Sequence, residues 1–145
     1  MLLAAANPLN ASELIFPTLE VIHIAGFAML AGTIALVDLR LLGWGMTRQT
    51  AAEIAQDVAP WTLIGLTLVL LSGPLLFSSD PDMYYLNRYF QVKMVLLLVA
   101  LVFQFTVHRN VAKVGAAPAR GTLVACISLA LWAAIVTSGI FIGFA

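Results

Sequence analysis

The sequence predicts an all-α membrane protein, an up-and-down bundle of four transmembrane helices with both termini in the periplasm. Hydrophobic residues make up 62% of the 145 residues, against roughly 45–50% in an ordinary soluble domain. Charged residues make up 10%, where about 25% is usual. So few charges cannot cover the surface of a soluble enzyme, and a net charge of zero argues against a nucleic-acid partner.

Four stretches without Asp, Glu, Lys or Arg supply the helices. They are residues 21–37, 58–79, 94–108 and 121–145. Because a bilayer core of about 30 Å needs roughly 20 apolar residues, the first and third helices must extend into flanking charged residues. We therefore expect one domain, 1–145, with helices at about 17–43, 59–78, 89–109 and 121–143. Pro17 and Pro60 suit first-turn positions.

The distribution of basic residues predicts the orientation. Those in or beside the first and third connections are Arg40, Arg48, Arg109, Lys113 and Arg120. The second connection has only Arg88, with Lys93 just inside the third helix. The positive-inside rule then places the first and third connections in the cytoplasm, as expected for a multi-pass protein of the bacterial inner membrane.

A short sequence is repeated near the ends of the second and fourth helices. Ser72-Gly73 closes the second helix, and Ser138-Gly139 closes the fourth. Two hairpins related by a pseudo-twofold axis would produce this repetition. Chance similarity between two apolar helices would produce it equally well.

Polar residues form matching stripes on the first and third helices. The first stripe is Glu20, His23 and Asp38, and the second is Lys93, Gln104 and His108. His23 to Asp38 and Lys93 to His108 both span fifteen residues, or about 22 Å of helix. If the stripes face each other, Glu20, His23 and Lys93 form an outer cluster. Asp38, Gln104 and His108 then form an inner cluster, with Arg109 at the next position.

Each cluster has a structural and a functional interpretation. A Glu20–Lys93 pair would simply hold the helices together, and Asp38 with His108 or Arg109 would do the same at the inner surface. His23 lies about two turns below the outer surface, either as a satisfied interior histidine or as a ligand. Ionisable groups inside a membrane normally face partners or functional sites rather than lipid.

Several site chemistries lack the necessary residues. The single Cys126 excludes a disulfide framework and a cysteine-rich metal site built from this chain alone. His23 and His108 lie too far apart in depth to share one metal. Neither Ser72 nor Ser138 has a side chain that could act as a general base three or four residues away on the same helix. No catalytic residue is therefore identified.

A series of motifs runs along nearly the whole chain. It consists of Phe16-Pro17-x-x-Glu20-x-x-His23-x-x-Gly26, Asp38-Leu39-Arg40-Leu41-Leu42-Gly43, Pro60-Trp61, Asn87-x-x-Phe90-x-x-Lys93 and His108-Arg109. The series resembles an uncharacterised family of bacterial inner-membrane proteins, known as a domain of unknown function. It is more distantly similar to the haem-b bundles of HemJ-type protoporphyrinogen oxidase and copper-resistance protein D. That similarity implies His23 as a haem ligand, with Arg40 and Lys93 at the family's basic positions.

The expected function is a small inner-membrane redox or cofactor-binding protein that holds haem b through His23, the one metal ligand expected. Glu20 and Lys93 would adjust the charge near the cofactor, and whether the protein is an enzyme stays open. The alternative is a non-catalytic membrane subunit, an assembly partner or a copper-handling component, with purely structural polar clusters. The expected partners are the lipid bilayer, another membrane or periplasmic redox protein, and a second copy of the chain.

Overall fold

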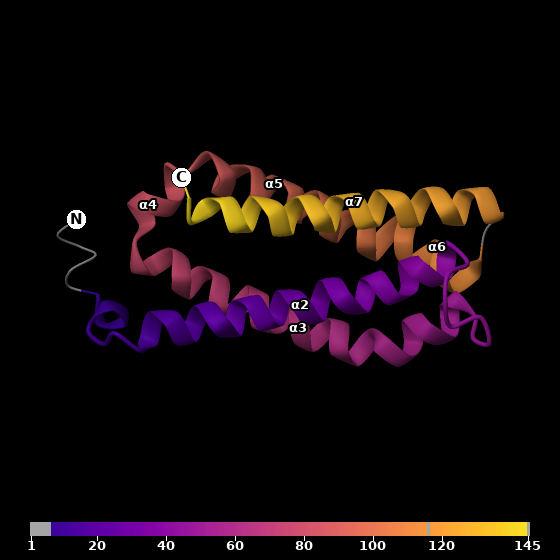
Figure 1. Ribbon diagram of the computed structural model, residues 1–145, viewed down its shortest axis with the longest axis horizontal. Helices are drawn as coiled ribbons and strands as arrows, with labels where there is room; N and C mark the ends of the chain where they lie inside the picture. The colour runs from indigo at the N-terminus through magenta and orange to yellow at the C-terminus, as the bar shows by residue number, and fades with distance from the viewer. Residues whose placement is uncertain (1–6, 116, 145) are drawn as a thin grey trace.

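The computed structural model describes residues 7–115 and 117–144 as a bundle of four long helices. The spans are α2 (Ile15–Leu41), α3 (Ala51–Ser79), a third span over Arg88–Val114, and α7 (Pro118–Ile142) (Figure 1). Each is long and apolar enough to cross a membrane. No strand occurs in the part of the chain that the structure describes. The chain is thus a multi-pass α-helical membrane protein.

The third span has three segments and is not a uniform α-helix. It consists of α5 (Arg88–Phe103), a π-helical turn labelled η2 (Gln104–His108), and α6 (Arg109–Val114). Two short elements lie outside the spans, η1 (Pro8–Asn10) and α4 (Pro81–Tyr85). A π-helical turn accommodates an extra residue within a helix and changes the direction of the side chains that follow it.

The second span begins earlier than expected. α3 starts at Ala51 rather than at about 59, because Thr50 and Glu53 form a capping box. The Glu53 backbone N–H donates to Thr50 Oγ1 at 3.2 Å, and the Thr50 backbone N–H donates to Glu53 Oε2 at 2.7 Å. The Thr-x-x-Glu signal is readable in the sequence. Pro60 therefore lies inside the helix, and the expectation of a first-turn position for it is wrong.

Asparagine side chains close the bundle at the end opposite α6. Asn10 donates from Nδ2 to the Ser79 carbonyl at 2.9 Å, and Asn87 donates to the Ile142 carbonyl at 3.1 Å. The last carbonyls of a helix have no partner within it. The asparagines that precede α2 and α5 thus donate hydrogen bonds to free carbonyl groups at the ends of α3 and α7.

The helices pack as two hairpins. α2 lies along α3, α5 lies along α7, and α2 also contacts α7, whereas α3 meets the second hairpin chiefly at α6 (Figure 1). The main core consists of Phe27, Leu30, Ile34, Val69, Leu97, Ala100, Trp132 and Ile135. A smaller core near α6 contains Val37, Ile54 and Ala112.

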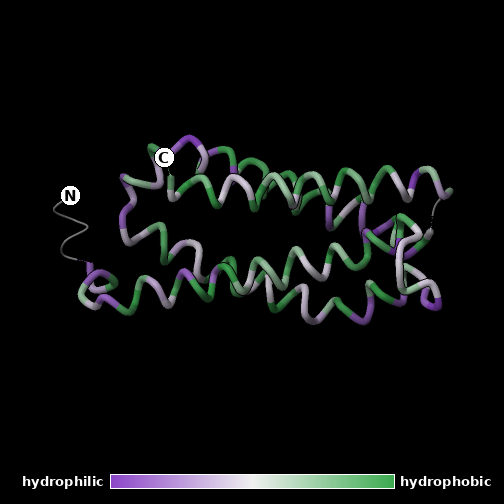
Figure 2. The backbone as a smooth tube through the Cα atoms, in the orientation of Figure 1, coloured by the Kyte–Doolittle hydropathy of each residue, from purple (hydrophilic) through white to green (hydrophobic). Residues whose placement is uncertain are grey.

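Hydropathy follows the long axis of the bundle. Figure 2 shows hydrophilic residues gathered at the two ends, with hydrophobic residues along most of the length between them. Many large apolar side chains on the spans are exposed, among them Leu71, Val95 and Leu123. An exposed apolar surface over the full length of four helices is what contact with lipid requires.

Candidate functional site

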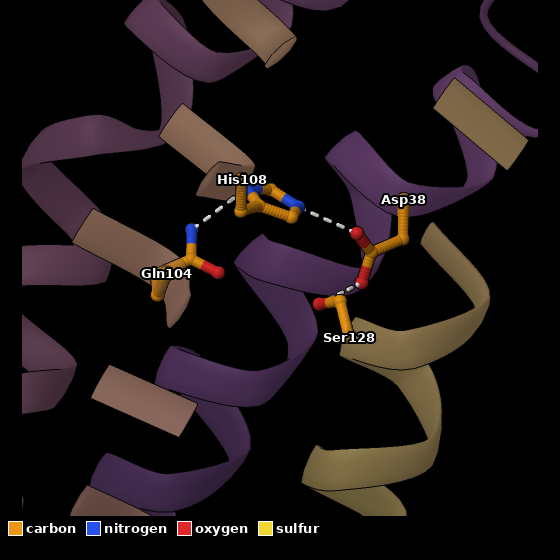
Figure 3. Close-up of polar contacts among 4 residues, drawn as sticks. All are labelled: Asp38, Gln104, His108 and Ser128. Atoms are coloured by element: carbon orange, nitrogen blue, oxygen red, sulfur yellow. Dashed lines mark hydrogen bonds and ion pairs between the residues drawn. The ribbon is translucent and has the colours of Figure 1, made fainter. Parts of the chain in front are cut away.

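Asp38 is the centre of a buried polar group formed by three spans. The His108 Nε2 atom lies 2.6 Å from Asp38 Oδ1, and Ser128 Oγ donates to Asp38 Oδ2 at 2.7 Å (Figure 3). Asp38 and Ser128 are 0% exposed and His108 is 1% exposed. Both carboxylate oxygens therefore have a partner, which is the usual condition for a buried acid.

Gln104 extends this buried group, the inner cluster, by one further hydrogen bond. Its amide Nε2 lies 3.0 Å from His108 Nδ1 (Figure 3). The amide nitrogen donates here, so Nδ1 accepts and the hydrogen on Nε2 is donated to Asp38. The Gln104 Oε1 atom is buried and has no partner among the described residues. The structure thus joins three of the expected inner residues, whereas Arg109 is exposed and outside the group.

The π-helical turn explains how His108 reaches Asp38. Fifteen residues of a straight α-helix overshoot four full turns by about 60°. The turn η2 takes up one additional residue between Lys93 and His108, so both side chains can approach α2. α2 has no such turn between His23 and Asp38. Asp38 accordingly faces the centre of the bundle, whereas His23 faces α3.

His23 is held by a serine of α3. Its Nδ1 lies 2.7 Å from Ser72 Oγ, and Ser72 Oγ donates to the Leu68 carbonyl at 2.5 Å. Since a hydroxyl has one hydrogen, Ser72 must accept from His23 Nδ1–H. A neutral imidazole with its hydrogen on Nδ1 carries its lone pair on Nε2. A Cβ on Gly73 would lie 3.4 Å from His23 Cε1, so the absence of a side chain there makes room for the ring.

Phe27 lies between His23 and Lys93. The His23 and Phe27 rings meet edge to face with centroids 5.4 Å apart, and Lys93 Nζ lies 4.7 Å from the Phe27 centroid. The Lys93 side chain passes Gly139, where a Cβ would lie 3.2 Å from Nζ. Glu20 is exposed and forms no ion pair with Lys93 among the described residues. The Glu20–Lys93 pair considered from the sequence is therefore not formed.

Arg40 has a local structural contact. Its Nε donates to the Gln49 carbonyl at 2.6 Å, which ties the end of α2 to the connection before α3. Arg40 follows Asp38 by two residues, so the two side chains diverge on the helix. Gln49 lies beside the end of the bundle opposite His23, so Arg40, one of the two basic positions that the resemblance implies, lies apart from His23 and Lys93.

Ser128 and Ser72 were missed as site residues by the sequence reasoning. The feature of the sequence that could have indicated them is a small polar residue inside an otherwise apolar span. Ser128, Asp38 and His108 have the residue types of a nucleophilic triad, but Ser128 donates to the carboxylate rather than to the imidazole. The hydroxyl therefore lacks the imidazole base of such a triad, and the arrangement does not support triad-type nucleophilic catalysis. Across 7–115 and 117–144 no three His, Cys, Asp or Glu residues gather as a metal site.

Four membrane-length helices around buried polar residues define the class, a small multi-pass α-helical membrane protein. The chain belongs to DUF6644, a family of unknown function, whose profile matches residues 14–145. No curated protein and no solved structure matches the chain. The family assignment covers nearly the whole bundle without assigning an activity.

Proposed function

We propose that the chain is a membrane redox protein that binds haem b through His23 Nε2. The observation that carries the proposal is the hydrogen bond from His23 Nδ1 to Ser72, which fixes the ring and, in a neutral imidazole, reserves the lone pair of Nε2 for a ligand. Metal-bound histidines commonly donate their other ring N–H to a neighbouring acceptor in this way. A haem iron needs one or two axial ligands, so the three-residue cluster of a simple metal site is not required.

Lys93 adds a second feature that suits haem. Its ammonium contacts the Phe27 ring and pairs with no carboxylate in the described ranges. An unpaired cation within a membrane span is costly and marks a functional site by default. Haem b carries two propionates at the edge of its ring, so an imidazole for the iron with a cation nearby suits both the metal and the negative charge of the cofactor.

Each residue has one role under this proposal. His23 holds the iron, Ser72 orients the imidazole, and Lys93 supplies positive charge for a propionate. The haem, when bound, supplies one-electron chemistry. The Asp38 group lies about four turns away along α2 and holds the two hairpins together.

The test is the absorbance spectrum of protein purified from haem-replete cells. We expect a Soret band in the wild type, its loss in His23→Ala, and its retention in His108→Ala. Ser72→Ala should keep the haem but bind it more weakly, by about 10- to 100-fold as for other residues that orient a metal ligand. Colourless wild-type protein would overturn the proposal.

A non-catalytic subunit is the second candidate, and the inner cluster favours it. Asp38 accepts from both His108 and Ser128 within a fully buried site, which suits a group whose role is to hold the helices together. This alternative predicts colourless protein that stays folded after His23→Ala and retains a specific protein partner on purification.

We also propose that both chain ends face the periplasm of a bacterial inner membrane. The support is the excess of Lys and Arg in the first and third connections. A fusion after Ala145 should be active as alkaline phosphatase and dark as green fluorescent protein. The reverse pattern would invert the orientation.

A further inference from the structure

A cavity of about 200 Å³ opens between α3 and the third span. Most of its wall is apolar and includes Val58, Leu63 and Phe105. Leu63 is 53% exposed and Phe105 is 45% exposed, so the cavity opens sideways onto the surface that faces lipid. It lies at the α6 end of the bundle, away from His23, and the proposed haem role does not use it.

Two basic residues lie at one end of this cavity. Arg109 and Lys113 both line it, and their spacing of four residues places them on one face of α6. Both are exposed, and neither forms an ion pair with any residue that the structure describes. α6 ends at Val114, so the two cations lie close to the end of the span, where the membrane surface is expected.

The charges and the exposed apolar side chains of the cavity match the parts of a phospholipid. Lys113 and Arg109 lie nearest the end of the span, and the exposed side chains of Phe105 and Leu63 lie deeper. The inner wall also carries polar side chains, which are Thr33, Thr62, Gln104 and His108. A phospholipid has its phosphate at the surface and its acyl chains deeper, where Phe105 and Leu63 lie. A soluble anion would leave the apolar part of the wall unused.

We propose that this cavity, between α3 and η2–α6, binds an anionic glycerophospholipid. Its phosphate lies between Arg109 and Lys113, and one acyl chain lies along Val58, Leu63 and Phe105. Basic pockets between transmembrane helices bind anionic head groups by this charge complementarity. The assignment does not depend on which side of the membrane α6 faces, since either leaflet can supply such a lipid.

The wild-type protein provides the first test. Delipidated protein in neutral detergent is titrated with phosphatidylglycerol or phosphatidylcholine, and bound lipid is measured by native mass spectrometry. We expect saturable binding of one phosphatidylglycerol and much weaker binding of phosphatidylcholine. Inorganic phosphate should not displace the lipid. Equal binding of both lipids overturns the proposal, and displacement by phosphate assigns the site to a soluble anion instead.

Variants separate the cavity from general attraction to a basic surface. The double variant Arg109→Gln, Lys113→Gln should lose about 25-fold in affinity for phosphatidylglycerol, or about fivefold per charge. Arg120→Gln is the matched control, because Arg120 is exposed at the same end of the bundle and does not line the cavity. It should retain the wild-type affinity.

A cavity-filling variant tests the acyl-chain site without changing charge. Ala59 lines the cavity, so Ala59→Leu should occupy its space and weaken phosphatidylglycerol binding as strongly as loss of one cation. Unchanged binding by Ala59→Leu, or equal weakening by Arg120→Gln, would show that lipid merely coats the basic end and would overturn the proposal.

Discussion

The first hairpin (α2 and α3) and the second hairpin (the third span and α7) each place a polar side chain beside a glycine of the later helix. The helices of the two hairpins nevertheless pack in different ways. In the first hairpin, His23 of α2 lies against Ser72 and Gly73 of α3. In the second, Lys93 of α5 lies against Gly139 of α7. The repeated Ser-Gly sequence thus has the same structural purpose twice, to make room for a polar side chain from the preceding span.

The residues around this point differ between the hairpins. Three positions after His23 is Gly26, whereas Leu96 follows Lys93 by the same interval. A Cβ on Gly65 of α3 would lie 2.8 Å from the Gly26 carbonyl oxygen, so the two backbones touch. At the position of Gly65, the second hairpin has Leu131, which packs against the core. The first hairpin is therefore held by close backbone approach and the second by leucine side chains.

The hairpins meet at equivalent positions. Asp38 follows His23 by fifteen residues, His108 follows Lys93 by fifteen, and the two side chains bond directly. The repeated Ser-Gly contacts and this bond are what a pseudo-twofold axis would produce, whereas α2 packs against α7 without comparable packing of α5 against α3. The repeat is imperfect, because only the second hairpin has a π-helical turn.

The largest expected effect comes from separating the hairpins at Asp38. Asp38→Ala and His108→Ala should each lower the free energy of unfolding by about 3 kcal/mol, because each leaves a buried hydrogen-bonding group without its partner. The double variant should cost at least about 1 kcal/mol less than the sum of the single variants. The measurement is reversible unfolding in mixed detergent micelles. Additive effects within about 0.5 kcal/mol would show that the pair does not connect the hairpins.

The next effect tests the close approach within the first hairpin. A Cβ on Gly65 would lie 2.7 Å from the Leu30 backbone nitrogen, so Gly65→Ala should cost about 2 kcal/mol through overpacking. Gly32→Ala is the matched control, because a Cβ there has no atom within 4 Å. It should instead stabilise by up to about 1 kcal/mol through helix propensity. Similar values for both variants in the same unfolding assay would contradict the backbone contact.

Sequence reasoning predicted the partners on α2 and η2 but missed the partner on α7. Asp38 and His108 were predictable because ionisable residues in apolar spans must find each other. Ser128 was not, since α7 is apolar on all sides and its hydropathy does not indicate which face points inward. The π-helical turn was equally hidden, because regular α-helical geometry was assumed over the third span. The capping box at Thr50 was readable in the sequence and would have corrected the start of α3.

A smaller effect is expected at Ser128, through which α7 takes part in the inner cluster. Ser128 donates to the carboxylate of Asp38, and hydrogen bonds to charged groups contribute about 1.5–3 kcal/mol. Ser128→Ala should therefore lower the free energy of unfolding by about 1.5 kcal/mol. Thr137→Ala is the control on the same helix, because Thr137 is exposed and bonds only the Ala133 carbonyl. Its effect should stay within about 0.5 kcal/mol, and equal losses would remove Ser128 from the group.

The smallest effect concerns Tyr84, in the segment α4 that connects the hairpins. Burial raises the pKa of Tyr84 above its ordinary value of 10.0, and the charges of Glu20 and Asp80 raise it further. The folded protein thus keeps the phenol proton to higher pH than the unfolded chain. The stabilisation is complete below about pH 10 and is lost as the pH rises through the folded pKa.

This shift can be measured because the chain has only three tyrosines. In a Tyr85→Phe, Tyr89→Phe background, the phenolate absorbance should report Tyr84 alone and rise at a higher pH than in free tyrosine. Glu20→Gln should lower this pKa in part, since burial is the larger cause. Glu13→Gln is the control, because Glu13 lies just before α2, the helix that carries Glu20, and is not among the causes of the shift. Ionisation at the ordinary pH, or an equal response to both substitutions, would show that Glu20 of the first hairpin does not act on the connection to the second.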